Sequence, residues 1–200
     1  MRKLLGGIIG GGENSFIGCA HRAAATLDGE AEIVAGVFSS DPERSRARGA
    51  ALGMDPNRVY ADCESMVRGE KALPEGRRID FVIIAVPNAA HYELAMAFLR
   101  EGFHVFSDKP MAVSLAQALS IHSEVKRRGL LYALTHGYTG YPLVKQARHL
   151  VREGEIGRLL RVVVEYTQGW LSPLVEDPGA FRTWHLDNYQ IGRASCRERV

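Results

Sequence analysis

The stretch LLGGIIGGGENSFIG, residues 4–18, decides the fold. Residues 4–9 form a short apolar run that predicts a β-strand, and the run of glycines after it predicts a tight turn. An amphipathic pattern over residues 17–27 predicts that a helix follows the turn. The chain therefore opens with a strand, a glycine-rich turn and a helix.

The rest of the first two-thirds of the chain repeats this alternation. Helices are expected over residues 91–101 and 114–128, and another begins near Asp41, an N-cap candidate followed by Pro42. Further strands are expected at residues 32–38, 58–60 (weak), 79–86, 103–107 and 130–135. The run 79–86 is the strongest, because it is apolar throughout, as in strands buried on both faces. Alternation of this kind predicts an α/β fold with a doubly wound parallel sheet of the Rossmann type.

The pattern changes after residue 135. Residues 141–152 predict a helix, Gly157 marks a turn, and residues 158–168 form a long β-rich run. A lone long strand needs partner strands, and residues 169–190 show no clear periodicity that would supply them. We therefore expect a Rossmann domain at 1–135 and the incomplete start of an α+β substrate domain at 136–190.

Composition excludes several classes of protein. The apolar fraction of 46% and the charged fraction of 24% are typical of a globular protein. The three cysteines, Cys19, Cys63 and Cys196, are scattered without metal-ligand spacing, so we expect free thiols, no metal and a cytoplasmic location. No apolar run approaches the length of a membrane span, so no membrane partner is expected.

The last ten residues stand apart from the rest. Residues 191–200 carry three Arg and one Glu, a net charge of +2, so residues 1–190 are neutral and the basic balance implies no nucleic-acid partner. The same ten residues match one reading frame of a common sequencing-adapter oligonucleotide, although a native basic tail is the alternative. We expect a foreign tail at 191–200 and a gene truncated near Gln190.

The glycine turn is the first candidate for a binding site. Gly10 and Gly12 would let backbone N–H groups approach a dinucleotide pyrophosphate at the helix N-terminus, where Phe16 and Ile17 are also candidate contacts. The strict G-x-G-x-x-G pattern fails because Ser15 occupies its third position, and the next glycine is Gly18. A purely structural glycine turn is the alternative.

The end of the second strand bears on the choice of cofactor. Enzymes that use NAD commonly place an acidic residue there to bind the ribose hydroxyls. Ser39 and Ser40 stand near that place and Arg44 follows one helical turn later, which suits the 2′-phosphate of NADP. The alternative is that Asp41 caps a helix and Arg44 is solvated, so NAD and NADP both stay open.

Two further strand ends carry candidate residues. Pro87 and Asn88 follow the strand at 79–86, and His91 is either a cofactor contact or simply the start of a helix. Asp108 and Lys109 follow the strand at 103–107, at the sheet edge where cofactors bind. Beside a positively charged nicotinamide the pKa of Lys109 should fall, which suits proton exchange with a substrate hydroxyl. A surface lysine in a loop is the alternative.

These motifs, in this order and spacing, resemble the Gfo/Idh/MocA oxidoreductases. The residues that carry the resemblance are the glycines from 10 to 18, Pro87-Asn88-x-x-His91, Asp108-Lys109-Pro110, Gly154-Glu155-Ile156-Gly157, and Trp184-His185-Leu186-Asp187. Three positions depart from the family pattern: Asp108 replaces the usual glutamate, Gly137 stands where asparagine is expected, and His185 stands where the family carries arginine. The Asp-x-x-x-His pair that follows the last segment in the family is absent here.

The resemblance implies NAD(P)-dependent transfer of a hydride to or from a sugar, cyclitol or related polyol, with Lys109 as the catalytic lysine. It also implies that the longer protein is a homo-oligomer that assembles through its C-terminal sheet. The alternative function is a non-catalytic dinucleotide-binding or sensor protein on the same fold. Without the family's Asp/His pair, we expect this chain by itself to be inactive.

Overall fold

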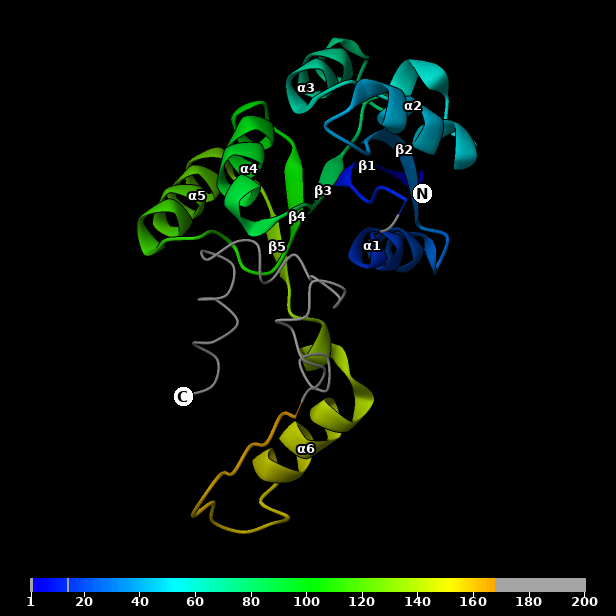
Figure 1. Cartoon of the computed structure of the whole chain (residues 1–200). Coiled ribbons are helices and arrows are strands. Elements are labelled where there is room, and N and C mark those ends of the chain that lie inside the picture. The colour runs from blue at the N-terminus through cyan, green and yellow to red at the C-terminus, as the bar shows by residue number, and fades with distance from the viewer. Residues whose placement is uncertain (1, 14, 168–200) are drawn as a thin grey trace, which may run out of the picture. The chain divides into compact units, whose positions relative to one another are not determined.

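The computed structural model describes residues 2–13 and 15–167 (Figure 1). The expectations for residues 168–200, which include the adapter-like tail and the Trp184 segment, lie outside the described residues. The chain divides between Thr135 and His136 into two compact units. Within the described ranges, no helix is long and apolar enough to cross a membrane.

The first unit is built on one parallel sheet of five strands. Their order across the sheet is β2-β1-β3-β4-β5, and every neighbouring pair is parallel. The strands are β1 (Leu4–Gly10), β2 (Ala31–Val37), β3 (Phe81–Ala85), β4 (His104–Asp108) and β5 (Tyr132–Thr135). The doubly wound fold predicted from the alternation is confirmed, and all five residues of β3 are buried, as expected for its continuous apolar run.

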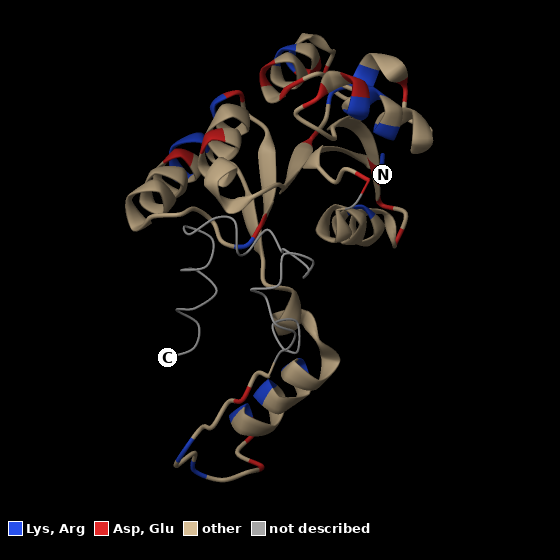
Figure 2. Ribbon diagram, viewed as in Figure 1, with Lys and Arg blue, Asp and Glu red and all other residues tan. Residues whose placement is uncertain are grey.

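Helices cover the two faces of the sheet. The helices are α1 (Phe16–Thr26), α2 (Pro42–Ala51), α3 (Cys63–Ala72), α4 (His91–Arg100) and α5 (Leu115–Arg128). Helix α1 packs Ile17 against a core of Ile8 and Ile83 on one face. Helices α3, α4 and α5 supply Met66, Phe98 and Ile121 to the larger core on the other face. Charged residues lie mainly on the helices and turns, as Figure 2 shows.

The weak strand predicted at residues 58–60 is wrong in extent. A short 3-10 helix covers Pro56–Arg58, and only one parallel bridge forms, between Gly36 and Val59. Asp55 caps the 3-10 helix and Asp62 caps α3, so few residues remain between them to extend a ladder. Through this bridge Val59 lies beside the outer side of β2, where a dinucleotide-binding sheet has its third strand.

The second unit contains a 3-10 helix (Gly137–Gly140) and α6 (Pro142–Arg152), which confirms the helix expected at 141–152. The long strand predicted at 158–168 is wrong for its described part. Residues 158–167 are exposed and carry no strand, and none of the described strands pairs with them.

A buried carboxylate anchors the start of β3. Glu70 of α3 is fully buried, and Arg58 donates two hydrogen bonds to it, of 3.1 and 2.6 Å. The Tyr60 hydroxyl donates a third, of 2.9 Å, and the backbone N–H of Ile79 donates a fourth, also of 2.9 Å. Burial and the neighbouring Glu70 carboxylate raise the pKa of Tyr60 to about 12. One side chain therefore links α3, the bridge segment and the entry to β3.

We expect Glu70→Gln to destabilise the first unit by about 3–5 kcal/mol, the cost of removing one charge from a buried pair. The substitution leaves the Arg58 guanidinium without its counter-charge. Urea unfolding followed by circular dichroism measures the change, and Glu64→Gln is the matched control, since Glu64 lies on the same helix with its side chain 89% exposed. Equal midpoints for the two variants would contradict the anchoring role.

Candidate functional site

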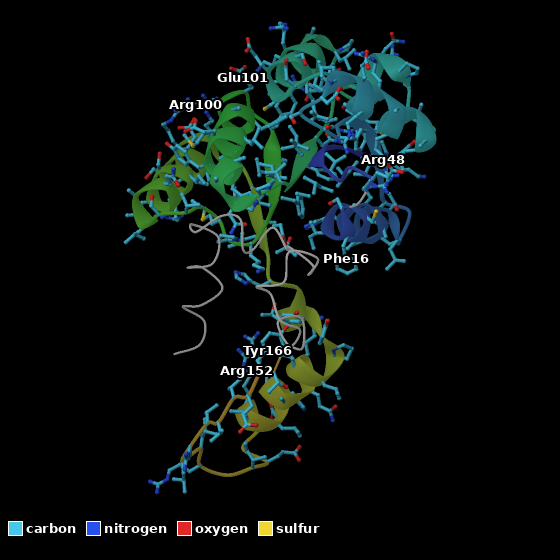
Figure 3. All side chains as sticks on the ribbon, viewed as in Figure 1. Phe16, Arg48, Arg100, Glu101, Arg152 and Tyr166 are labelled. Atoms are coloured by element: carbon cyan, nitrogen blue, oxygen red, sulfur yellow. The ribbon has the colours of Figure 1, made fainter. Side chains whose placement is uncertain are left out.

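The candidate residues lie where β1, β3 and β4 end. Strand β1 lies between β2 and β3, so the chain crosses to one side after β1 and to the other side after β2. Such a switch in direction leaves a crevice at the carboxyl ends of the strands, where ligands bind in open α/β sheets. In Figure 3 Phe16, at the start of α1, lies toward the carboxyl edge of the sheet. Arg100 and Glu101, at the C-terminal end of α4, lie toward the opposite edge.

The glycine loop brings the start of α1 against the end of β1. A Cβ atom on Gly18 would lie 2.2 Å from Cα of Gly11, and one on Gly10 would lie 2.0 Å from the carbonyl oxygen of Ala85. The hydroxyl of Ser15 caps α1 by accepting a hydrogen bond of 3.1 Å from the N–H of Gly18. The first turn of α1 carries no acidic residue, so its N-terminus suits an anion.

Three other residues that the sequence predicts as cofactor contacts differ in their surroundings. A Cβ atom on Gly12 would lie 2.9 Å from the carbonyl oxygen of Phe38, so this glycine is required by the packing of the loop on the end of β2. The side chain of Ile17 is half-buried and packs against the core beneath α1. Phe16 is 86% exposed and free to contact one.

The end of β2 offers hydroxyls and a cation. Asp41 accepts hydrogen bonds from the N–H groups of Glu43 and Arg44, which confirms it as the cap of α2. Ser39 accepts a hydrogen bond of 3.1 Å from the N–H of Asp41, while Ser40 and Arg44 are exposed. The end of β2 is therefore followed by two serines where NAD enzymes often carry an acidic residue.

The end of β3 is fixed by a buried histidine. Pro87 is exposed and Asn88 is buried, and His91 is only 1% exposed. The ring of His91 lies between two carbonyl oxygens, with Nδ1 2.6 Å from that of Pro110 and Nε2 2.9 Å from that of Val86. Both ring nitrogens therefore contact carbonyl groups, and His91 links two loops at the start of α4.

The end of β4 presents the candidate catalytic lysine. Lys109 is exposed, and its peptide bond to Pro110 is cis. Ser107, fully buried, donates a hydrogen bond of 3.0 Å to the carbonyl oxygen of Asp108. The carboxylate of Asp108 lies 3.7 Å from Nε2 of His21 on α1, so it faces α1.

His21 is the residue that the sequence analysis missed. It lies three positions after Gly18, which puts it one helical turn further along α1. A histidine at that spacing from the glycine turn was a usable signal. Among the described residues, no group of three His, Cys, Asp or Glu side chains could hold a metal ion.

The comparison with protein families agrees with this geometry. The model of the oxidoreductase family with an NAD-binding Rossmann fold, Gfo/Idh/MocA, matches residues 5–136. The chain belongs to this family. The match covers the glycine loop, both strand-end motifs and Lys109.

Solved structures and a curated relative extend the comparison. An inositol dehydrogenase homologue from Azotobacter vinelandii, complexed with NADH and myo-inositol, is 36% identical with a TM-score of 0.75, over 78% of this chain and 41% of that one. An oxidoreductase from Sinorhizobium meliloti is 44% identical with a TM-score of 0.72, over 78% and 43%. The levoglucosan dehydrogenase of Pseudarthrobacter phenanthrenivorans is 28% identical over 96% of this chain and 47% of its own length. The chain spans about half the length of the curated relatives it matches.

We expect Gly18→Ala to weaken binding of NADH to this chain by about 10- to 100-fold, the loss of one hydrogen bond from a backbone N–H to a charged phosphate. The added methyl group would force α1 away from Gly11. Quenching of tryptophan fluorescence or titration calorimetry measures the affinity. Gly137→Ala is the control, because a Cβ atom there meets nothing within 4 Å. Unchanged affinity in Gly18→Ala would exclude the loop as the pyrophosphate site.

Proposed function

We propose that the protein transfers a hydride between a nicotinamide cofactor and a sugar, cyclitol or related polyol, with Lys109 as the acid/base. The observation that carries the proposal is the position of an exposed lysine at the carboxyl end of β4, at the same sheet edge as the glycine loop after β1. A binding module has no need of a lysine there, so Lys109 favours an enzyme over the non-catalytic alternative. The names of the relatives, which act on levoglucosan and D-apiose, support the substrate class.

The residues of this chain divide the work of the reaction. Backbone N–H groups at the start of α1 would bind the pyrophosphate, and Pro87 and Asn88 would border the cofactor at the end of β3. When bound, the nicotinamide supplies C4 as the hydride donor or acceptor. The Lys109 amine would take the proton of the substrate hydroxyl during oxidation and return it during reduction.

The test of the proposal is the substitution of Lys109. In the product of the complete reading frame that contains these residues, Lys109→Met should lower kcat by about 10²–10⁴-fold, the usual contribution of a general acid/base. The affinity for NADH should stay within about twofold, because the backbone of the loop is retained. Steady-state rates at 340 nm with a panel of polyols measure the first quantity, and calorimetry the second.

Lys126→Met, on α5, is the matched control for this test. An unchanged kcat in Lys109→Met would remove the lysine from the mechanism. Tight cofactor binding without turnover of any polyol would favour the sensor alternative.

The choice between NAD and NADP is tested at the end of β2. If the 2′-phosphate lies beside α2, Arg44→Ala should weaken NADPH binding by about fivefold, the scale of an exposed charge pair of about 1 kcal/mol, and leave NADH unaffected. Arg46→Ala, also exposed on α2, is the control. Equal effects on the two cofactors, or none, would mean that Arg44 is simply solvated.

A further inference from the structure

The two residues that flank Lys109 are each in contact with a histidine, and the histidines come from different elements. On one side, Nδ1 of His91 on α4 lies 2.6 Å from the carbonyl oxygen of Pro110. On the other side, Nε2 of His21 on α1 lies 3.7 Å from a carboxylate oxygen of Asp108. Lys109 itself is exposed between these two contacts.

The contact between His21 and Asp108 lies away from bulk water. The side chains are 11% and 19% exposed, in contrast to the surface ion pairs of α3 and α6. Among the described residues, Nε2 of His21 has no hydrogen-bond partner, although the atom itself is shielded from solvent. Buried polar atoms are rarely left without a partner, and the carboxylate of Asp108 is the acidic group within reach.

The two histidines connect different elements. His91 joins the ends of β3 and β4, because its ring contacts the carbonyl groups of both Val86 and Pro110. His21 joins the end of β4 to α1, the helix whose N-terminus faces the cofactor crevice. The contact between His21 and Asp108 therefore links the loop that carries Lys109 to α1.

We propose that His21 is a positioning residue for Lys109: by holding Asp108 it orients the lysine toward the cofactor bound at α1, while His91 fixes the other side of the loop. The inference rests on the proposed function, since it takes Lys109 as the group that faces the nicotinamide. His21 touches neither substrate nor cofactor in this assignment. Asp108, expected from the sequence to contact the cofactor, acts instead as the link between His21 and Lys109.

The test measures acetylation of Lys109 in this chain with and without NADH, by limited reaction with an N-hydroxysuccinimidyl acetate and mass spectrometry of the peptides. Lys71, Lys126 and Lys145 serve as internal references in the same samples. At a cofactor concentration ten times the Kd, a lysine covered by the cofactor should react up to about tenfold more slowly. Each variant is measured at its own saturating concentration, so a change in affinity does not enter the comparison.

Three variants separate positioning from general damage. His21→Leu removes the polar contact, His21→Gln retains a side-chain N–H donor without the ring, and His122→Leu changes an exposed histidine on α5. The expected result is protection of Lys109 in the parent, in His21→Gln and in His122→Leu, and loss of protection in His21→Leu with its cofactor affinity kept. A purely structural role would not be restored by glutamine.

The outcomes distinguish the two hypotheses. Protection in His21→Leu equal to that in the parent overturns the positioning role and leaves Lys109 at the cofactor. Absence of protection in the parent, although NADH binds, overturns the proposed place of Lys109 and the positioning role with it. If His21→Leu does not fold, Asp108→Asn removes the same charge from the other partner, and retained protection in that variant counts against the proposal.

Discussion

The contact between the backbones of Gly11 and Gly18 is the constraint on which the site depends. No side chain fits between these residues, so α1 begins directly against the end of β1. That approach aligns the free N–H groups of the first turn with the crevice at the carboxyl edge of the sheet. The same glycine turn sets the direction of α1, and with it the place of His21 one turn later.

Rigidity below the crevice comes from buried polar groups rather than from the apolar core alone. Glu70 accepts four hydrogen bonds that join α3 to the entry of β3, and His91 joins the exits of β3 and β4. A satisfied buried polar group specifies one arrangement, because any displacement leaves a donor or acceptor unpaired. Strand β3 is thus fixed at both ends, and the loop that carries Lys109 follows its neighbour β4, which is fixed at its exit.

Much of the fold could be predicted from local signals, because each signal had a local cause. Apolar runs, a proline after a cap and a glycine after a helix place β3, the start of α2 and α5 within one or two residues. The predictions at 58–60 and 158–168 failed because strand formation depends on a neighbouring strand, which local composition does not reveal. The candidate residues differed in the same way. Lys109, Pro87 and Asn88 were identifiable by motif. The inward orientation of His91 and the contact of His21 were not, because they depend on packing between distant segments.

The two histidines beside the lysine loop make contacts of different length. The distance of 3.7 Å between a carboxylate oxygen of Asp108 and Nε2 of His21 exceeds the length of a hydrogen bond. The loop that carries Lys109 therefore has a longer contact on the α1 side and a hydrogen-bond distance of 2.6 Å, between Nδ1 of His91 and the carbonyl oxygen of Pro110, on the α4 side. A small displacement of the loop changes the closer contact most, because hydrogen bonds weaken steeply away from their preferred geometry.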